Sequence, residues 1–386
     1  MVFHVVEVIV SISMAVFVGF YLFYLAVCVR YQKTKYNVTS VSAVSGDPPY
    51  VSIIVPTCNE AQVIKRKMEN LRELRYPRDK FEIVFVDGGS TDGTVELIEC
   101  MSKNSNLTIK IVRQLRRKGF NRAVIDGFAE TTGDMICVTG AETEYDPDAL
   151  NAMITHFKDP KIGAVTGRQE IKNVKDGYSP RLEVSYRRLY DLVRQAESNL
   201  DSPFDIKGEI SAARRSVFAH IVEKPELSDK GAMDTCISFQ AKIDGYRTIY
   251  EPNAVYRELS PKSIRESFKQ QIRRAATLIE NMMAFKFMIF NRRFGAFGLL
   301  IMPAHFVMLI VLPFVMLFTS IGLLVAVALN PLSYLLPIFV VALLATLLFS
   351  RVQAFLKTQL ALTIAVLGLV SGIETQKFEQ LPSTRA

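Results

Sequence analysis

The chain has 386 residues, 49% of them hydrophobic, and carries a formal net charge of +8. This length allows a domain of about 200–250 residues with a further part beside it, and the hydrophobic content is high for a purely soluble protein, which indicates membrane segments. The charge suits an anionic membrane surface or nucleotide phosphates; nucleic acid is not an expected partner, and five scattered cysteines without a C-x-x-C pair argue against a disulfide framework or a zinc site.

The first predicted element is an uncharged apolar run over residues 8–29. It is long enough to cross about 30 Å of hydrocarbon as a helix. Glu7 precedes the run, and Arg30, Lys33 and Lys35 follow it. Because positive residues favour the cytosolic side, we expect the amino terminus outside and residue 30 onward in the cytosol. Residues 1–47 are therefore predicted to be a membrane anchor and a linker.

Residues 48–260 alternate between strand-like and helix-like segments. The predicted strands are 51–55, 81–86, 107–112 and 135–139, and the predicted helices between them are 61–74, 92–103 and 120–132. A strand every 25–30 residues or so, with a helix between, is typical of βαβ units in a mostly parallel sheet. Ligands of such sheets bind beyond the carboxyl ends of the strands.

Acids and hydroxyls follow three of these predicted strands. Asp87 ends the second strand and precedes a glycine-rich turn, Thr57 and Glu60 follow the first, and Glu142 and Glu144 follow the fourth. A plain turn uses the same residue types, so no single strand end is decisive. Together they indicate one polar crevice at the carboxyl edge of the sheet.

The segment 261–293 is basic and amphipathic. Ile264, Phe268 and Ile272 share one face of a helix, which favours a position along a membrane surface. Residues 294–350 then contain no charged side chain, and residues 297–329 and 332–350 are expected to span the membrane. The run 358–372 is either a third span or a re-entrant segment. Region 294–375 thus holds two or three helices, four transmembrane helices are expected in the whole chain, and 376–386 is a polar tail.

Several segments together resemble the family-2 glycosyltransferases over roughly residues 50–280. They are "VSIIVPTCNE", "VDGGSTDGT", "KGFNRAVIDGFAETTGDMICVTGAETEYDPDAL" and "MDTCISFQAKIDGYRTIYEP". The resemblance implies an α/β GT-A domain, Rossmann-like with a mostly parallel sheet, in the cytosol and joined to an α-helical transmembrane bundle. The anchor and the helix cluster look like those of the membrane-embedded hyaluronan, chitin and cellulose synthases.

The resemblance also implies roles on the donor side. Thr57, Glu60 and Asp87 match positions that hold the nucleotide base and ribose, and Lys118 matches a basic residue near the nucleotide. Lys118 also lies in a charged run, where a solvated side chain is the ordinary expectation.

A metal site is implied at the family's D-x-D motif. The segment reads Gly140-Ala141-Glu142, so the first acid is absent and Glu142 stands at the second. A carboxylate there suits Mg2+ or Mn2+. Glu144 is the alternative ligand.

Two further motifs concern the acceptor and the chemistry. Asp234 stands at the position of the family's catalytic base, with Asp229 as the alternative. A carboxylate there would remove the proton of the acceptor hydroxyl. Gln271 and Arg274 match the Q-x-x-R-W motif, whose arginine helps to hold the diphosphate; its tryptophan is absent from this chain.

The resemblance predicts an inverting glycosyltransferase of the hexosyltransferase type, with UDP-sugars as favoured donors. The enzyme would build and export a polysaccharide as a multi-pass protein of the cell membrane. Its partners would be a nucleotide-sugar donor, a glycan or lipid-linked acceptor and the bilayer; the oligomeric state is left open. One alternative is transfer of a single sugar to a polyprenyl phosphate. Another is a scaffold that binds nucleotide sugars without catalysis, since acids are absent at Gly88, Gly140 and Met233.

Overall fold

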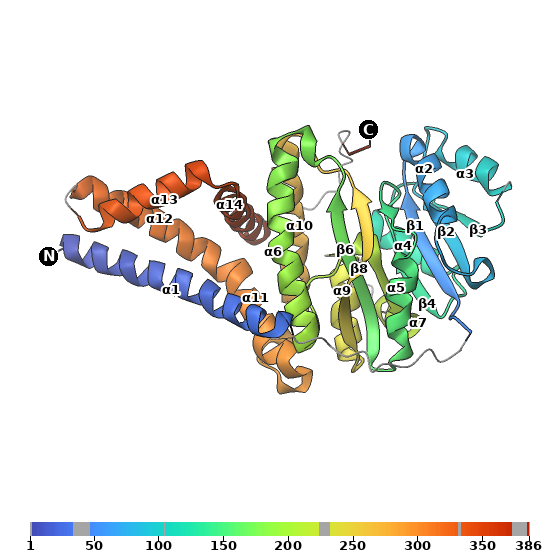
Figure 1. Cartoon of the computed structure of the whole chain (residues 1–386), viewed down its shortest axis with the longest axis horizontal. Coiled ribbons are helices and arrows are strands. Elements are labelled where there is room, and N and C mark those ends of the chain that lie inside the picture. Colours follow the sequence, from blue (N-terminus) through green and yellow to red (C-terminus); the bar gives the residue numbers. More distant parts are fainter. Residues whose placement is uncertain are drawn as a thin grey trace.

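One eight-stranded sheet, in the order β3-β2-β1-β4-β7-β6-β8-β5, organises the α/β part of the chain (Figure 1). The computed structural model describes residues 2–33, 47–103, 105–223, 232–330, 333–372 and 384–385. The strands are β1 (Val51–Thr57), β2 (Phe81–Asp87), β3 (Thr108–Arg113), β4 (Met135–Val138), β5 (Glu144–Tyr145), β6 (Ile162–Ile171), β7 (Ser211–Arg214) and β8 (Arg247–Glu258).

The sheet is mixed, with four parallel and three antiparallel strand pairs. β1 pairs in parallel with β2 and β4, β2 with β3, and β6 with β8, whereas β7 is antiparallel to β4 and β6, and β5 to β8. The four predicted strands are all present as β1 to β4. The predicted α/β fold class is therefore confirmed, with three antiparallel pairs added.

Helices cover both faces of the sheet because successive strand residues point to opposite sides. In β1, Ile53 packs in the cluster under α2, α3 and α5, and Ile54 packs in the cluster with α4, α7 and α9. All seven residues of β2 are buried, as expected for a central parallel strand. These helices are α2 (Ala61–Arg72), α3 (Thr94–Lys103), α4 (Phe120–Phe128), α5 (Ala149–Thr155), α7 (Arg215–Val222) and α9 (Met233–Ile243).

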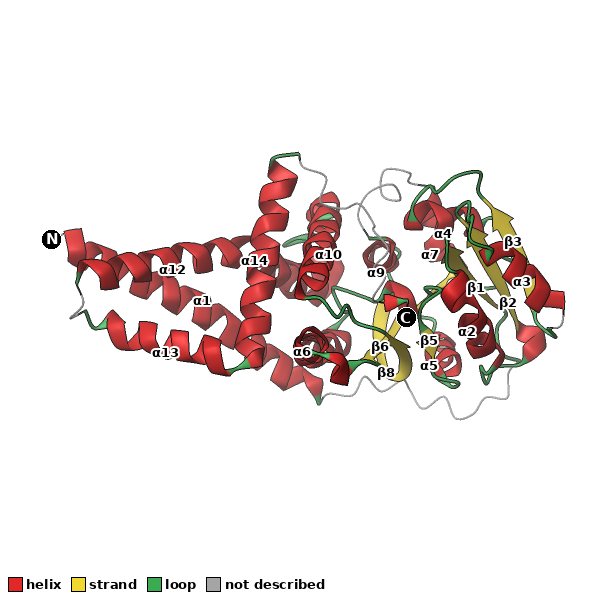
Figure 2. Ribbon diagram, turned by 90° about the horizontal axis from the view of Figure 1, so that it is seen from above, coloured by secondary structure: helices red, strands yellow, loops and turns green. Residues whose placement is uncertain are grey.

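Two long helices, α6 (Tyr178–Leu200) and α10 (Ile264–Ala284), separate the sheet from a bundle of apolar helices (Figures 1 and 2). α6 packs on α1 (Val2–Gln32), and both α6 and α10 pack on α14 (Ser350–Val370). Glu197 of α6 ties the layers together: it accepts hydrogen bonds from Tyr24 of α1 and from His305 Nε2, at 2.6 Å for the latter. The long helices are therefore positioned to connect the two parts of the molecule.

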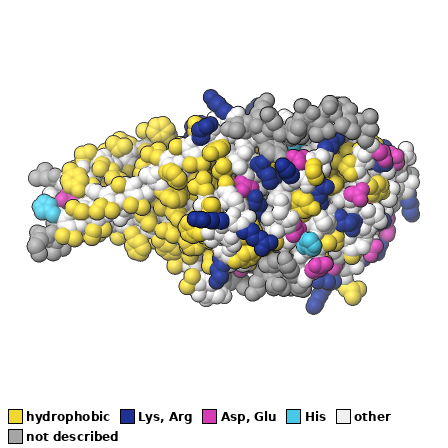
Figure 3. Space-filling model, turned by 90° about the horizontal axis from the view of Figure 1, so that it is seen from below, with side chains coloured by type: hydrophobic (Ala, Val, Ile, Leu, Met, Phe, Trp, Pro, Cys, Tyr) yellow, Lys and Arg dark blue, Asp and Glu magenta, His cyan; other side chains and the backbone are white. Residues whose placement is uncertain are grey.

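Three helical segments of the described chain are long and apolar enough to cross a membrane: His4–Gln32, Phe297–Leu329 and Ser350–Val370. α13 (Leu335–Leu348) is apolar but shorter. The second segment contains α11 (Met302–Phe306) and α12 (Leu312–Leu329) with π-helical turns before each. Pro303 and Pro313 stand at the starts of α11 and α12, where they lack an N–H donor, and this explains the interrupted hydrogen-bond ladder. A band of hydrophobic side chains covers this end of the molecule (Figure 3).

The carboxyl-terminal helices differ from the expected spans. The span expected over 332–350 is α13, which ends at Leu348, and the run expected to begin at residue 358 is part of a helix that begins at Ser350. Arg351 and Lys357 therefore lie within α14. Lys357 donates a 2.7 Å hydrogen bond to Ser267 of α10, so its ammonium group has a polar partner within the helix packing.

Candidate active site

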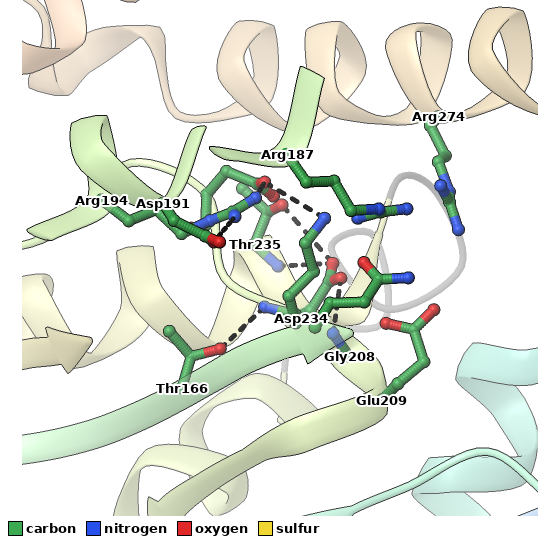
Figure 4. Close-up of polar contacts among 12 residues, drawn as sticks. Thr166, Arg187, Asp191, Arg194, Gly208, Glu209, Asp234, Thr235 and Arg274 are labelled. Atoms are coloured by element: carbon green, nitrogen blue, oxygen red, sulfur yellow. Dashed lines mark hydrogen bonds and ion pairs between the residues drawn. The ribbon is translucent and has the colours of Figure 1, made fainter. Parts of the chain in front are cut away.

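Asp234 lies in the first turn of α9, and backbone amides hold its carboxylate. One oxygen accepts from the N–H of Gly208 at 3.0 Å, and the other accepts from the N–H of Thr235 at 2.8 Å (Figure 4). Asn281 of α10 donates a 2.6 Å bond to the carbonyl of Ala232, which fixes the start of α9. The carboxylate is thus oriented by main chain from two separate elements.

A charged segment before β7 surrounds this carboxylate. Burial first, and then the charges of Asp205 and Glu209, raise the pKa of Asp234 to about 7. Burial would also raise the pKa of Asp205 and of Glu209, but nearby cations hold both pKa values below their usual range. These cations are Lys207 and Arg194 at Asp205, and Arg274 and Lys207 at Glu209. Neighbouring carboxyls with separated pKa values are typical of acid–base sites. Of these three carboxyls, Asp234 is the one that can take up a proton near neutral pH.

A cavity of about 130 Å³ begins at Asp234 and reaches the apolar bundle. α6 contributes Glu183 and Arg187 to its wall, α10 contributes Gln271 and Arg274, and α14 contributes residues of the 358–362 turn. In Figure 4, Arg187 and Arg274 extend from their helices toward Asp234 and Glu209. The structure therefore brings together Asp234, Gln271 and Arg274, three of the residues predicted from the sequence.

The arginine of the Q-x-x-R motif is held by two carboxylates. Arg274 lies 3.6 Å from Glu183 and 4.0 Å from Glu258, the last residue of β8. Burial and the charge of Glu209 raise the pKa of Glu258 to about 7. The Oε1 atom of Gln271 is buried and has no hydrogen-bond partner among the described residues. This amide oxygen is available to a ligand hydroxyl.

Thr57 and Asp87 lie opposite each other at the carboxyl ends of β1 and β2. Asp87 accepts hydrogen bonds of 3.0 Å from the N–H groups of Gly89 and Ser90, and the Thr57 hydroxyl donates to the Val86 carbonyl at 3.3 Å. Gly89 has φ +78°, which favours glycine. Both side chains thus help to build the turns that shape this edge.

Glu60 and Glu142 converge on one cation, the guanidinium of Arg385. Its Nη2 atom lies 2.7 Å from Glu60 Oε1 and 3.6 Å from Glu142 Oε1. Burial and the charge of Glu60 raise the pKa of Glu142, although Arg385 opposes this. Glu144, the alternative metal ligand, instead forms ion pairs with Arg66 at 2.8 Å and Lys172 at 2.7 Å.

This pair of acids fits a divalent cation. Glu60 and Glu142 already share a positive group, and carboxylate oxygens are suitable ligands for Mg2+ or Mn2+. No cluster of three or more His, Cys, Asp or Glu side chains with metal-site geometry occurs in the described ranges. Further ligands would therefore have to come from donor phosphates or water.

Other predicted residues lie apart from the Asp234 cavity. Its wall does not include Thr57, Glu60, Asp87, Lys118 or Glu142. Lys118 is 42% exposed and pairs with Asp126 at 3.2 Å, which fits a solvated lysine. Glu209 links the two regions electrostatically, since its charge raises the pKa of both Asp234 and Glu142. Asp229 falls outside the described residues.

Comparison with known proteins identifies the domain that contains these residues. Residues 52–222 match the family described as "Glycosyl transferase family 2". They form a family-2 glycosyltransferase domain. This glycosyltransferase domain includes β1, β2, β4 and the Gly208 segment, while Asp234 and α10 follow it in the chain.

A solved structure and two bacterial enzymes are similar to a longer part of the chain than this domain. The mannosyltransferase PcManGT from Pyrobaculum calidifontis, in complex with GDP-Man and Mn2+, is 26% identical with a TM-score of 0.80, covering 96% of this chain and 100% of that one. Poly-beta-1,6-N-acetyl-D-glucosamine synthase from Staphylococcus aureus (strain COL) is 27% identical over 66% of this chain, and that from Staphylococcus epidermidis is 27% identical over 58%. The matched regions span 60% and 53% of the lengths of these two relatives.

Sequence reasoning missed part of the cavity wall. The segment "PFDIKGEI" alternates buried apolar residues with charged ones that face the cavity, namely Asp205, Lys207 and Glu209. This period of two was the available signal. On α6, the spacing of Glu183, Arg187, Tyr190 and Arg194 places them on one helical face, which was a second signal.

Proposed function

We propose that the chain is an inverting glycosyltransferase that moves a sugar from a nucleotide-diphosphate donor to an acceptor hydroxyl at the membrane. The observation that carries the proposal is the Asp234 carboxylate: main-chain amides orient it, its pKa is about 7, and it lies in the wall of a cavity that reaches the apolar helices. A general base needs this combination of geometry and pKa.

In the proposed reaction the acceptor hydroxyl gives its proton to Asp234 as its oxygen attacks the anomeric carbon. A new C–O bond forms on one face of the sugar, the bond to the diphosphate breaks on the other, and the nucleoside diphosphate leaves with the electron pair. The amides of Gly208 and Thr235 keep the carboxylate aimed. Arg274 lies where its charge could stabilise developing negative charge on the phosphates.

A divalent cation bound by Glu142 and Glu60 would neutralise charge on the departing diphosphate. The solved mannosyltransferase binds GDP-Man and Mn2+, which supports a nucleotide-sugar donor and a metal-assisted reaction here. The staphylococcal enzymes are named as polysaccharide synthases, which supports a saccharide hydroxyl as the acceptor group. The non-catalytic scaffold is disfavoured because Asp234 keeps a base-like environment although Met233 replaces the neighbouring acid.

We also propose that the glycosyltransferase domain lies in the cytosol and the amino terminus outside. Arg30 lies in the last turn of α1, and Arg292 and Arg293 precede the second apolar segment. This placement follows the positive-inside rule. Protease added to sealed inverted vesicles should cleave exposed sites between residues 48 and 290, and protection of these sites from that side would reverse the topology.

The activity is tested with the full-length chain in lipid nanodiscs. A panel of radiolabelled UDP- and GDP-sugars is supplied with Mg2+ or Mn2+, and both released nucleoside diphosphate and glycosylated products are measured. At least one donor should be consumed in a metal-dependent reaction. Failure of every donor with folded protein would contradict the proposed function.

A further inference from the structure

The Asp234 cavity has a polar end and an apolar end. Three helices, α6, α10 and α14, each turn one face toward the cavity. On α10 this face consists of Gln271, Arg274 and Leu278, which are spaced by three or four residues, and the lining residues of α6 and α14 have a similar spacing. Leu309 and Leu362 belong to one hydrophobic cluster and the partly buried Leu278 packs against it, so the apolar wall is continuous. Leu309 and Leu362 come from segments with the length and hydropathy of membrane spans.

The polar end carries as much negative as positive charge. Its acids are Glu183, Asp205, Glu209 and Asp234, and its bases are Arg187, Arg194, Lys207 and Arg274. Carboxylates already engage the arginines: Arg187 with Glu183 at 2.6 Å and Arg194 with Asp205 at 2.6 Å. A phosphate would have to displace these partners and approach ionised Asp205 and Glu209, so an anionic head group is disfavoured.

Two hydrogen-bonding atoms at the same end remain without partners in the described part of the chain. Gln271 Oε1 and Arg187 Nε are buried without hydrogen-bond partners among the described residues. Arg187 is 6% exposed, and both residues line the cavity. One is an acceptor and the other a donor, and a sugar hydroxyl can satisfy either. Because buried polar atoms without partners are costly, the pair indicates a ligand group that both donates and accepts hydrogen bonds, as a sugar hydroxyl does. Glu183 already balances the charge of Arg187, so this group need not be charged.

The apolar end does not suit a hydrated glycan. Sugar hydroxyls placed against Leu278, Leu309 and Leu362 would lose their hydrogen bonds to water without replacement. A hydrocarbon chain would bury its surface there at no such cost. The two ends together require an amphiphile, with its hydroxylated head beside Asp234.

We infer that the acceptor is a membrane lipid bearing an uncharged sugar, with the sugar at Asp234, Gln271 and Arg187 and the hydrocarbon chain along Leu278, Leu309 and Leu362. This inference rests on the proposed function, because it assigns the acceptor of the same site. The lipid chain keeps the acceptor at the membrane, and the hydroxyl that Asp234 deprotonates belongs to the sugar.

The test uses methyl, octyl and dodecyl glycosides of glucose, galactose, mannose and N-acetylglucosamine, together with a polyprenyl phosphate. Each is added to the full-length chain in nanodiscs with a donor that the protein consumes. At least one glycoside series should be glycosylated, with the acceptor KM falling tenfold or more from methyl to octyl, since each buried methylene contributes roughly a fourfold factor. The polyprenyl phosphate should remain unmodified.

Several results would overturn the inference: equal KM values along a series, glycosylation of the polyprenyl phosphate, or no glycosylated glycoside while the donor is still split. Loss of donor splitting itself would instead count against the proposed function. Leu278→Gln should reduce the methyl-to-octyl KM ratio toward one. Leu299→Gln, at a position 46% exposed and outside the cavity wall, should keep the wild-type ratio; an unchanged ratio in folded Leu278→Gln would contradict the placement of the chain.

Discussion

The backbone N–H of Gly208 donates a 3.0 Å hydrogen bond to the carboxylate of Asp234. The two residues come from different elements, a 3-10 turn before β7 and the first turn of α9. A Cβ atom at position 208 would lie 3.1 Å from Asp234 Oδ2. The absence of a side chain therefore sets the position of the proposed base.

Gly208→Ala should displace the Asp234 carboxylate by a few tenths of an ångström or more. We expect kcat to fall about ten- to a hundredfold with little change in donor binding, because catalysis is sensitive to small misplacements. Steady-state kinetics and donor titration measure the two effects. Gly19→Ala is the matched control, since nothing lies within 4 Å of a Cβ there. Wild-type kcat in Gly208→Ala would show that this contact does not position the base.

The pH profile should report the environment of Asp234. A base must be deprotonated, so kcat/KM should rise with pH and then level off. The midpoint of this rising limb should lie near pH 7, the pKa of Asp234. Asp205→Asn removes a charge that raises the pKa, so the limb should move to lower pH. Lys207→Met removes a charge that lowers it, so the limb should move to higher pH. Shifts in the same direction, or none, would contradict the assignment.

Glu142→Gln should raise the Mn2+ concentration needed for half-maximal activity by about ten- to a hundredfold, because a charged ligand is lost. A metal titration at fixed donor concentration measures this. Glu144→Gln is the control: Glu144 is paired with Arg66 and Lys172, and its variant should titrate like the wild type. A wild-type titration in Glu142→Gln together with a raised half-saturating concentration in Glu144→Gln would place the metal at Glu144 instead.

Arg385→Ala should have the reverse effect on the metal titration. The guanidinium bridges Glu60 and Glu142 and competes with a divalent cation for the same oxygens. Removing an ion pair worth about 1 kcal/mol should lower half-saturation by about fivefold. The half-saturating Mn2+ concentration of Arg385→Lys should lie between those of Arg385→Ala and the wild type. A higher half-saturating Mn2+ concentration in Arg385→Ala would contradict this competition and would mean that Arg385 assists donor binding.

The strands that hold the donor-side residues could be predicted because β1, β2 and β4 are buried apolar runs bounded by turns. β7 could not: its four residues "SAAR" have little strand propensity, and they are extended because they pair with β4 and β6. β8 could not be predicted as one strand because Pro252 lies near its middle, and the pairing with β6 shifts register next to this proline. The extended conformation of β7 and β8 therefore depends on pairing with distant strands rather than on local sequence.

The same distinction applies to the site. Asp234, Gln271 and Arg274 were predicted from motif positions, and the structure places them around one cavity. The contacts of Arg385 with Glu60 and Glu142 join residues more than 240 positions apart, and no local pattern could have indicated them. The bond from Lys357 to Ser267 could not be predicted either, because it depends on how α14 packs on α10.

Asp234→Asn removes the proposed catalytic base. The variant keeps the shape of the side chain but cannot accept the proton of an acceptor hydroxyl, whereas Asp244→Asn, at the other end of α9, changes an acid distant from the cavity. Donor binding by calorimetry and sugar transfer are measured on both in nanodiscs. We expect wild-type donor affinity with transfer reduced at least about a thousandfold in Asp234→Asn, and near-normal transfer in Asp244→Asn. Near-normal turnover in Asp234→Asn would contradict this role of Asp234.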